Sequence, residues 1–338
     1  MDKDKAFKWE SKLKLIGVEA ELLYAANNSI YLKKYKANAS NAIIDIPEYI
    51  IVDTYMYNNI FEGLRGDIKL HIHGEYRGNN CTFFRGNKEL SSVEFGLYGK
   101  CGSISLKEMF FRCNSLKWVN IVQLNTEVVN IDRIFSECRN IQSIDIKCLD
   151  LSRCSSADGA FNNCELLEDL DTSNMDTGNM RNMKSMFRGC KCLKELDVSK
   201  FNMGNAIWAD EMFQDMYSIS RLDVSNWEAP NLRSIRGMFY ECKQLKMIDL
   251  GNINEGRSEG TLEISGVMDD CISLVAIRIG RGVNSLCKQN IGRNKIYGVQ
   301  SLKYVCGLPL IDFYDSNYKR VTPVHMLDKS MDKIFEEA

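Results

Sequence analysis

The sequence predicts an α/β solenoid built from coils of about 26 residues, each with one short strand and one short helix. Two observations carry this prediction. A Phe or Met anchor, most often followed three residues later by Cys, recurs at positions 84, 110, 135, 161, 187, 213, 239 and 268. Each anchor precedes apolar residues spaced as Leu-x-x-Leu-x-Leu. A period this regular predicts coils that stack, because a single coil cannot bury its own apolar side.

The N-terminal residues 1–41 are expected to form a cap. Glu21–Tyr24 and Ser29–Lys33 flank the turn-forming pair Asn27-Asn28, which predicts a hairpin over the open edge of the first coil. Residues 42–308 are then expected to form the solenoid, in about ten coils. Its strands would form one parallel sheet on one face, and its short helices would cover the other.

The pattern inside one coil sets the elements in order. Met183, Met186, Phe187 and Cys190 are spaced as one face of a helical turn. The apolar residues after Cys190 end in the alternation of a strand. Residues 309–338 are expected to form a tail in which Met326–Ala338 is a short helix. Four prolines leave no Pro-rich linker, so we predict one domain.

Composition excludes several classes of function. The 338 residues carry 43 Lys+Arg and 45 Asp+Glu, a net charge of -2, which predicts no direct nucleic-acid binding. The charged start lacks the apolar stretch of a signal peptide, and no window reaches the ~18 apolar residues of a membrane span. We therefore expect a cytoplasmic protein with no membrane contact and with its 13 cysteines reduced.

Metal and enzyme chemistry are not predicted. The sequence has no Cys-x-x-Cys pair, and its three histidines are His71, His73 and His325. The repeated cysteines are read as small core residues, because Met216 and Asn87 replace them in two coils. Phosphate-loop, zinc-protease and nucleophile-elbow motifs are missing. We expect no catalytic residue, no cofactor and no metal.

The repeat resembles a known family. Leu196-Asp-Val-Ser199 and Leu222-Asp-Val-Ser-Asn226, each following a Met-Phe anchor, are similar to the BspA-like leucine-rich repeats. Ile43–Ile50 and Ile277–Val283 resemble the other repeat form of that family. The resemblance implies a leucine-rich-repeat solenoid that binds proteins, as in bacterial surface adhesins and proteins of mobile elements.

Two columns of residues are expected to point outward from the sheet. Asp145, Asp171, Asp197, Asp223 and Asp249 are 26 residues apart, and Ser173, Ser199 and Ser225 follow as hydrogen-bond donors. This regularity favours a structural role, while a calcium row or a partner contact remains open. In the second column the residue type changes from coil to coil, so repeat geometry does not dictate it and function is free to. This variable column reads Lys69, Ser92, Trp118, Ser143, Asp169, Glu195, Arg221, Met247, Ala276 and Tyr304.

These columns define the predicted partner-binding residues: Trp118, Asp169, Asp171, Glu195, Asp197, Arg221, Asp223 and Met247. The acidic centre predicts a partner protein with a basic surface. We expect a non-enzymatic inhibitor or adaptor that acts by occupying a surface, such as a phage or mobile-element antagonist of a host defence complex. The alternative is a BspA-like surface adhesin whose leader has been removed. Oligomeric state is left open.

Overall fold

The computed structural model describes residues 2–15, 18–26, 28–37, 40–56, 60–253, 262–280, 294–306, 311–325 and 333–334. The chain divides into two compact units, Met1–Cys154 and Ser155–Ala338. Each is described by itself. The bounds that the sequence predicts for cap, solenoid and tail stay a prediction.

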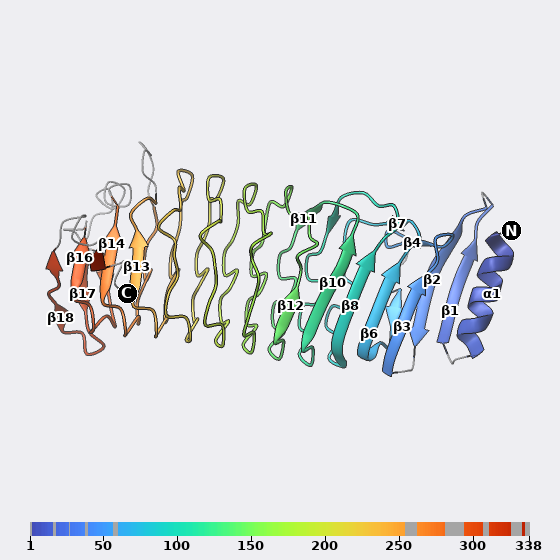
Figure 1. Cartoon of the computed structure of the whole chain (residues 1–338), viewed down its shortest axis with the longest axis horizontal. Coiled ribbons are helices and arrows are strands. Elements are labelled where there is room, and N and C mark those ends of the chain that lie inside the picture. Colours follow the sequence, from blue (N-terminus) through green and yellow to red (C-terminus); the bar gives the residue numbers. More distant parts are fainter. Residues whose placement is uncertain are drawn as a thin grey trace. The chain divides into compact units, whose positions relative to one another are not determined.

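The first unit begins with a helix and a hairpin. Helix α1 (Asp2–Leu15) has acidic residues in its first turn and basic residues in its last, as the helix dipole favours. It lies beside β1 (Val18–Tyr24), which pairs antiparallel with β2 (Ile30–Ala37) (Figure 1). The hairpin is the predicted one. The helix was not predicted, because it is mostly charged and lacks a wide apolar stripe.

Two ladders of strands build the first unit. The longer is a parallel sheet in the order β12-β10-β8-β6-β3. Its strands are β3 (Ser40–Ile46), β6 (Arg65–Ile72), β8 (Leu90–Leu97), β10 (Trp118–Leu124) and β12 (Ser143–Asp145). The shorter strands join the hairpin or pair with each other; they are β4 (Ile51–Asp53), β5 (Phe61–Glu62), β7 (Tyr76–Arg77), β9 (Ile104–Ser105) and β11 (Val128–Asn130).

The second unit repeats this plan with fewer strands. One parallel sheet contains β13 (Met247–Leu250), β14 (Ala276–Ile279), β16 (Tyr304–Cys306) and β19 (Val324–His325). A second contains β15 (Asn294–Ile296), β17 (Ile311–Tyr314) and β18 (Arg320–Val321). Of the predicted tail helix Met326–Ala338, only 333–334 lie among the described residues, and these are helical.

The sheet is less continuous than predicted. Among the described residues, no strand is assigned between Asp145 and Met247. Neighbouring coils of the second unit are joined on their other side by single bridges along Ser156, Asn182, Trp208, Ser234 and Glu263. The coils keep the predicted path, and the ladder of regular strand pairing is replaced by turns and isolated bridges.

Turns take the place of the predicted short helices. Glu108 and Arg112 flank Phe110 with positive φ angles of 59° and 61°. Alternate backbone N–H groups therefore leave the coil: that of Phe110 donates to Ile134 of the next coil (2.8 Å), while that of Cys113 donates to Phe110 (3.0 Å). A helix would direct every N–H along its own axis. The same pair of left-handed residues flanks the later anchors, including Phe213.

The core is a stack of the anchor residues. Phe187 is fully buried, and its ring lies parallel to Phe161 at 5.4 Å and to Phe213 at 5.9 Å in the second unit. The three leucine-type positions of each coil are buried beside this stack. The fold is thus a solenoid of the leucine-rich-repeat type.

None of the helices among the described residues is long and apolar enough to cross a membrane.

Candidate protein-binding face

The outward face of the second unit is formed by residues that alternate with buried leucines. Leu196 and Leu222 are 7% and 6% exposed, while the preceding Glu195 and Arg221 are exposed. Asp169 is exposed in the same way one coil earlier, and Met247 on β13 is half-buried. The structure therefore places these four predicted residues on one face.

The aspartate column has a structural task. Each Asp carboxylate accepts a hydrogen bond from the backbone N–H two residues later, at 2.9 to 3.1 Å, and so fixes the turn after the strand position. The hydroxyl groups of Ser199 and Ser225 also donate to Asp197 and Asp223, each at 2.6 Å. The Ser199 hydroxyl and N–H hold the pKa of Asp197 below its ordinary value.

A groove crosses this face. It has a volume of about 580 Å³ and is lined from three consecutive coils. Its charged lining consists of three cations, Lys194, Arg221 and Lys246, and four carboxylates, Glu195, Asp197, Asp223 and Asp249. Asp249 is further paired with Arg278 at 2.8 Å. The predicted Asp169 and Asp171 are exposed but do not line the groove.

Charge on this face changes along the coils. When the turn-forming Asp column is set aside, the outward positions run from Glu168 and Asp169, through Lys194 and Glu195, to Arg221 in the next coil. Met247 follows Lys246 in the last coil of the groove. These variable positions therefore pass from acidic to basic along the second unit, while the Asp in each coil leaves the groove lining as a whole with one more carboxylate than cations.

Trp118 opens β10 in the first unit. Its side chain is 40% exposed, and with Lys117, Gln142 and Asp145 it lines a shallow depression of about 410 Å³. It pairs in register with Ser143 on β12. An exposed tryptophan beside a hollow is a typical anchor for a protein partner.

The variable column needs three corrections. Ser92 pairs with Asp67, and Lys69 pairs with Glu94, so Lys69 lies two residues from its predicted place. The cause is that β6 and β8 pair at an offset of 25 residues, as Trp118 and Ser143 do, whereas the predicted column places Lys69 only 23 residues before Ser92. Ser92 is buried at 2% exposure, and Ala276 is fully buried, so neither presents a side chain to a partner.

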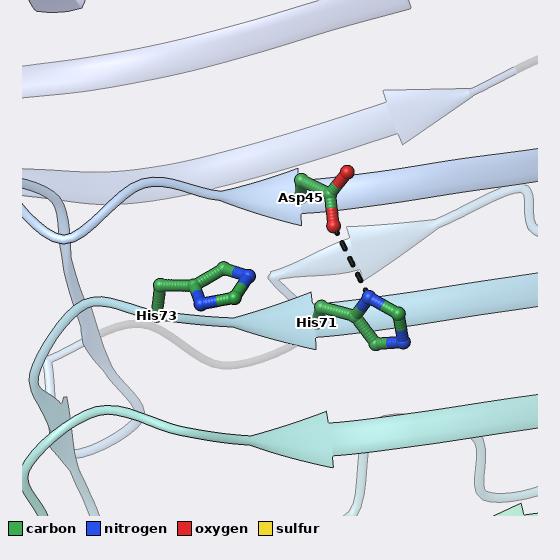
Figure 2. Close-up of side chains that lie close together, drawn as sticks. All are labelled: Asp45, His71 and His73. Atoms are coloured by element: carbon green, nitrogen blue, oxygen red, sulfur yellow. Dashed lines mark ion pairs between the residues drawn. The ribbon is translucent and has the colours of Figure 1, made fainter. Parts of the chain in front are cut away.

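A second cluster on the first unit was missed by the sequence analysis. Asp45 on β3, His71 on β6 and His73 just after β6 lie together on the outward face, as Figure 2 shows. His71 Nδ1 lies 3.2 Å from Asp45 Oδ1, and His71 Nε2 lies 3.1 Å from Glu94 Oε1. The sequence carried a signal for it, because Asp45 and His71 are separated by one repeat length and pair in register.

Residues 104–195 and 155–257 match a family described as "Mycoplasma protein of unknown function, DUF285". No curated protein matches the chain.

The chain is similar to three solved bacterial structures. One is a leucine-rich cell surface protein from Faecalibacterium prausnitzii, at 14% identity and a TM-score of 0.32, covering 93% of this chain and 95% of that one. A leucine-rich repeat protein from Bacteroides ovatus has 14% identity and a TM-score of 0.34, with coverage of 88% and 90%. The T. pallidum leucine-rich repeat protein has 11% identity and a TM-score of 0.25, with coverage of 94% and 92%.

Proposed function

We propose that the chain is a non-enzymatic module that binds a partner protein through the outward face of its strand positions. One observation carries this proposal. The Asp column is used to fix turns, whereas the neighbouring column, with Glu195 and Arg221, is exposed beside a groove and changes from coil to coil. Stacked coils offer an extended surface of this kind for binding.

The partner is expected to carry a charge gradient opposite to that of the face. A basic region would meet Glu168 and Asp169, and an acidic region would meet Arg221 and Lys246. The sequence predicts a partner with a basic surface, and this proposal adds an acidic region to it. Trp118 in the first unit is proposed as a separate aromatic contact, beside its own depression.

More specifically, we propose a cytoplasmic inhibitor or adaptor with BspA-like repeats that acts by occupying a surface of its partner. A phage or mobile-element antagonist of a host defence complex would be such a protein. A surface adhesin would use the same face, and the two are separated by where the protein resides. Fractionation of the native cells, with the protein detected in the cytoplasm or at the surface, decides between them.

A photo-crosslinking residue placed at 221 tests the binding face directly. The matched control places it at 236, because Arg236 is exposed and lies two residues after Ser234, which is one of the single bridges on the other side of the coils. Both proteins are expressed in the native host, irradiated, and the cross-linked products are identified. The proposal expects one protein of constant identity from position 221 and none from position 236.

Equal cross-linking from both positions would show that the groove is not the binding face. The further control Glu195→Lys, made together with the probe at 221, should reduce the product, since it inverts a charge that lines the same groove. If the product is unchanged, the partner does not contact the groove.

A further inference from the structure

We propose that Asp45, His71 and His73 form a binding site for a divalent transition-metal ion, with Zn²⁺ as the best-suited ion. One ligand atom from each side chain lies within 4.8 Å of the others (Figure 2). Two imidazoles and one carboxylate suit Zn²⁺ and its neighbours, whereas Ca²⁺ and Mg²⁺ prefer sites made of oxygen alone. This inference is independent of the proposed partner binding.

The spacing of the ligand atoms is close to what the ion requires. A tetrahedral ion about 2.1 Å from each ligand places the ligand atoms about 3.4 Å apart. Asp45 Oδ1 and His71 Nδ1 already stand at 3.2 Å. The His73 ring is exposed, so a side-chain movement of up to about 1.4 Å, the difference from the 4.8 Å limit, would complete the set.

The placement of His71 between two carboxylates favours a cation at this point. A neutral imidazole has one N–H, so it can donate to Asp45 or to Glu94 but not to both. With an ion on Nδ1, the Nε2–H donates to Glu94 and Asp45 binds the ion. A metal-bound histidine whose other nitrogen donates to a carboxylate is a common supporting arrangement. Glu94 would then be a positioning residue.

The backbone and an aromatic ring hold the histidines in place. Asp45 and His71 pair across β3 and β6, and the N–H of His73 donates to the Ile46 carbonyl at 2.9 Å. The Tyr98 ring stacks on His73 at 4.7 Å and meets His71 edge-on at 5.6 Å.

Gly96 makes room for the Tyr98 ring. It lies on β8 and pairs in register with His71 on the neighbouring strand β6. A Cβ at Gly96 would approach the Tyr98 ring to 2.5 Å. The sequence therefore supplies a glycine where the wall of the histidine cluster needs the space.

Three protein ligands leave a fourth tetrahedral position. Asp45 is 60% exposed, so that position faces solvent and can take water or a carboxylate or imidazole from another molecule. The ion would also join the edge strand β3 to β6, and its binding would stabilise the folded chain.

The test uses the full chain, without a histidine tag and with its accessible thiols alkylated. Zn²⁺ is titrated by calorimetry, with Mg²⁺ as the oxygen-preferring control. We expect saturable one-to-one Zn²⁺ binding, no Mg²⁺ binding, and a higher melting temperature with Zn²⁺. In an NMR spectrum of the histidine rings, His71 and His73 should shift on Zn²⁺ addition, and the third histidine, His325, should not.

The variants separate ligands from their support. Glu94→Gln should weaken Zn²⁺ binding by about 10- to 100-fold, as losses of supporting carboxylates do. His73→Ala and Asp45→Ala should weaken it more, and their exposed positions leave the fold intact in a thermal melt without metal. His325→Ala is the matched control and should bind as the unmodified chain does.

Two results would overturn the site. One is the absence of saturable Zn²⁺ binding to the folded chain. The other is Zn²⁺ binding that survives His73→Ala and Asp45→Ala unchanged. Co²⁺ then identifies the true ligands, because a thiolate site gives an intense sulfur-to-cobalt band that a histidine and carboxylate site lacks.

Discussion

The thiol of Cys242 donates a hydrogen bond to the backbone carbonyl of Phe213, one coil earlier, at 3.0 Å. The same bond recurs where Cys follows an anchor, from Cys113 to Phe84, Cys138 to Phe110, Cys190 to Phe161 and Cys271 to Phe239. All of these thiols are fully buried. Cysteine therefore fills the position because it is small, apolar and still able to donate to a carbonyl inside the core.

Cys242→Ala should lower the free energy of unfolding by about 2 kcal/mol. The change removes a buried sulfur and leaves the Phe213 carbonyl without its donor, and each loss costs about 1 kcal/mol or more. Urea unfolding followed by circular dichroism measures the effect. Cys192→Ala is the control, since Cys192 is only half-buried and is not one of the cysteines that follow an anchor by three residues. Equal losses of stability in the two variants would contradict this role of the thiol.

The buried thiols should make the fold sensitive to alkaline pH. Burial raises the pKa of Cys113 and of Cys190 from an ordinary value near 9 to about 12. Because the unfolded chain then loses thiol protons at lower pH than the folded chain, this contribution to stability is complete below about pH 9 and declines as pH rises toward 12. Denaturation midpoints measured from pH 7 to 11 should fall in the upper half of this range; a flat profile would contradict it.

Thiol reactivity gives an independent measure of the same burial. A disulfide reagent at pH 8 should react with few thiols in the native protein and with all 13 in denaturant without reductant. The half-buried Cys101, Cys148 and Cys192 should react first among the described cysteines. Fast reaction of Cys138 or Cys242 in the native state would show that the cysteines beside the stacked anchors are open to solvent.

The solenoid could be predicted from the sequence because every coil repeats the same burial. Phe187, Leu193 and Leu196 recur at fixed distances, and repetition averages out local ambiguity. The backbone between the anchors could not be predicted this way. Met183, Met186 and Phe187 are spaced as in a helix, but the left-handed Ser185 and Gly189 interrupt it. These positions take residues of several kinds, and the matching pair in another coil is Glu211 and Asp215.

The candidate site was predictable only in part. Exposure of Glu195 and Arg221 follows from strand alternation, which the repeat makes visible. The groove could not be predicted, because its lining includes Lys194 and Lys246. Each of these cations directly precedes a residue of the variable column and belongs to neither predicted column. Asp45 and His71 are one repeat length apart, which makes them candidate neighbours, and the register of β3 against β6 brings them together.

Asp197→Ala should destabilise the chain, whereas Asp169→Ala should not. The Asp197 carboxylate accepts the Ser199 N–H at 3.0 Å and its hydroxyl at 2.6 Å, so its loss should cost about 0.5–1 kcal/mol at this exposed position. Asp169 is equally exposed but belongs to the variable column. Thermal melting of the two variants measures the difference. A larger loss for Asp169→Ala would reverse the roles assigned to the two columns.

Phe187→Ala should lower the free energy of unfolding by about 3–5 kcal/mol, because it opens a cavity between two stacked rings in the second unit. Phe187→Leu keeps most of the volume and should cost clearly less. Phe7→Ala is the control, since that ring is 67% exposed and should change stability by less than about 0.5 kcal/mol. Similar costs for Phe187→Ala and Phe187→Leu would mean that filled volume does not set the stability of the stack.

Opposite charge reversals in two adjacent coils of the groove should both slow partner association. Once the partner cross-linked at 221 is purified, Glu195→Lys should slow its association and Arg221→Glu should slow it too, because each reversal opposes its own part of the gradient. Combining the two restores the net charge but not the gradient, so association should stay slow. Arg236→Glu makes the same change of charge on the other side of the coils, near Ser234, and should have little effect on the association rate. Surface plasmon resonance at two salt concentrations measures the rates, and added salt should reduce the differences. If the double variant associates at the original rate, net charge alone attracts the partner, and the order of charges along the face plays no part.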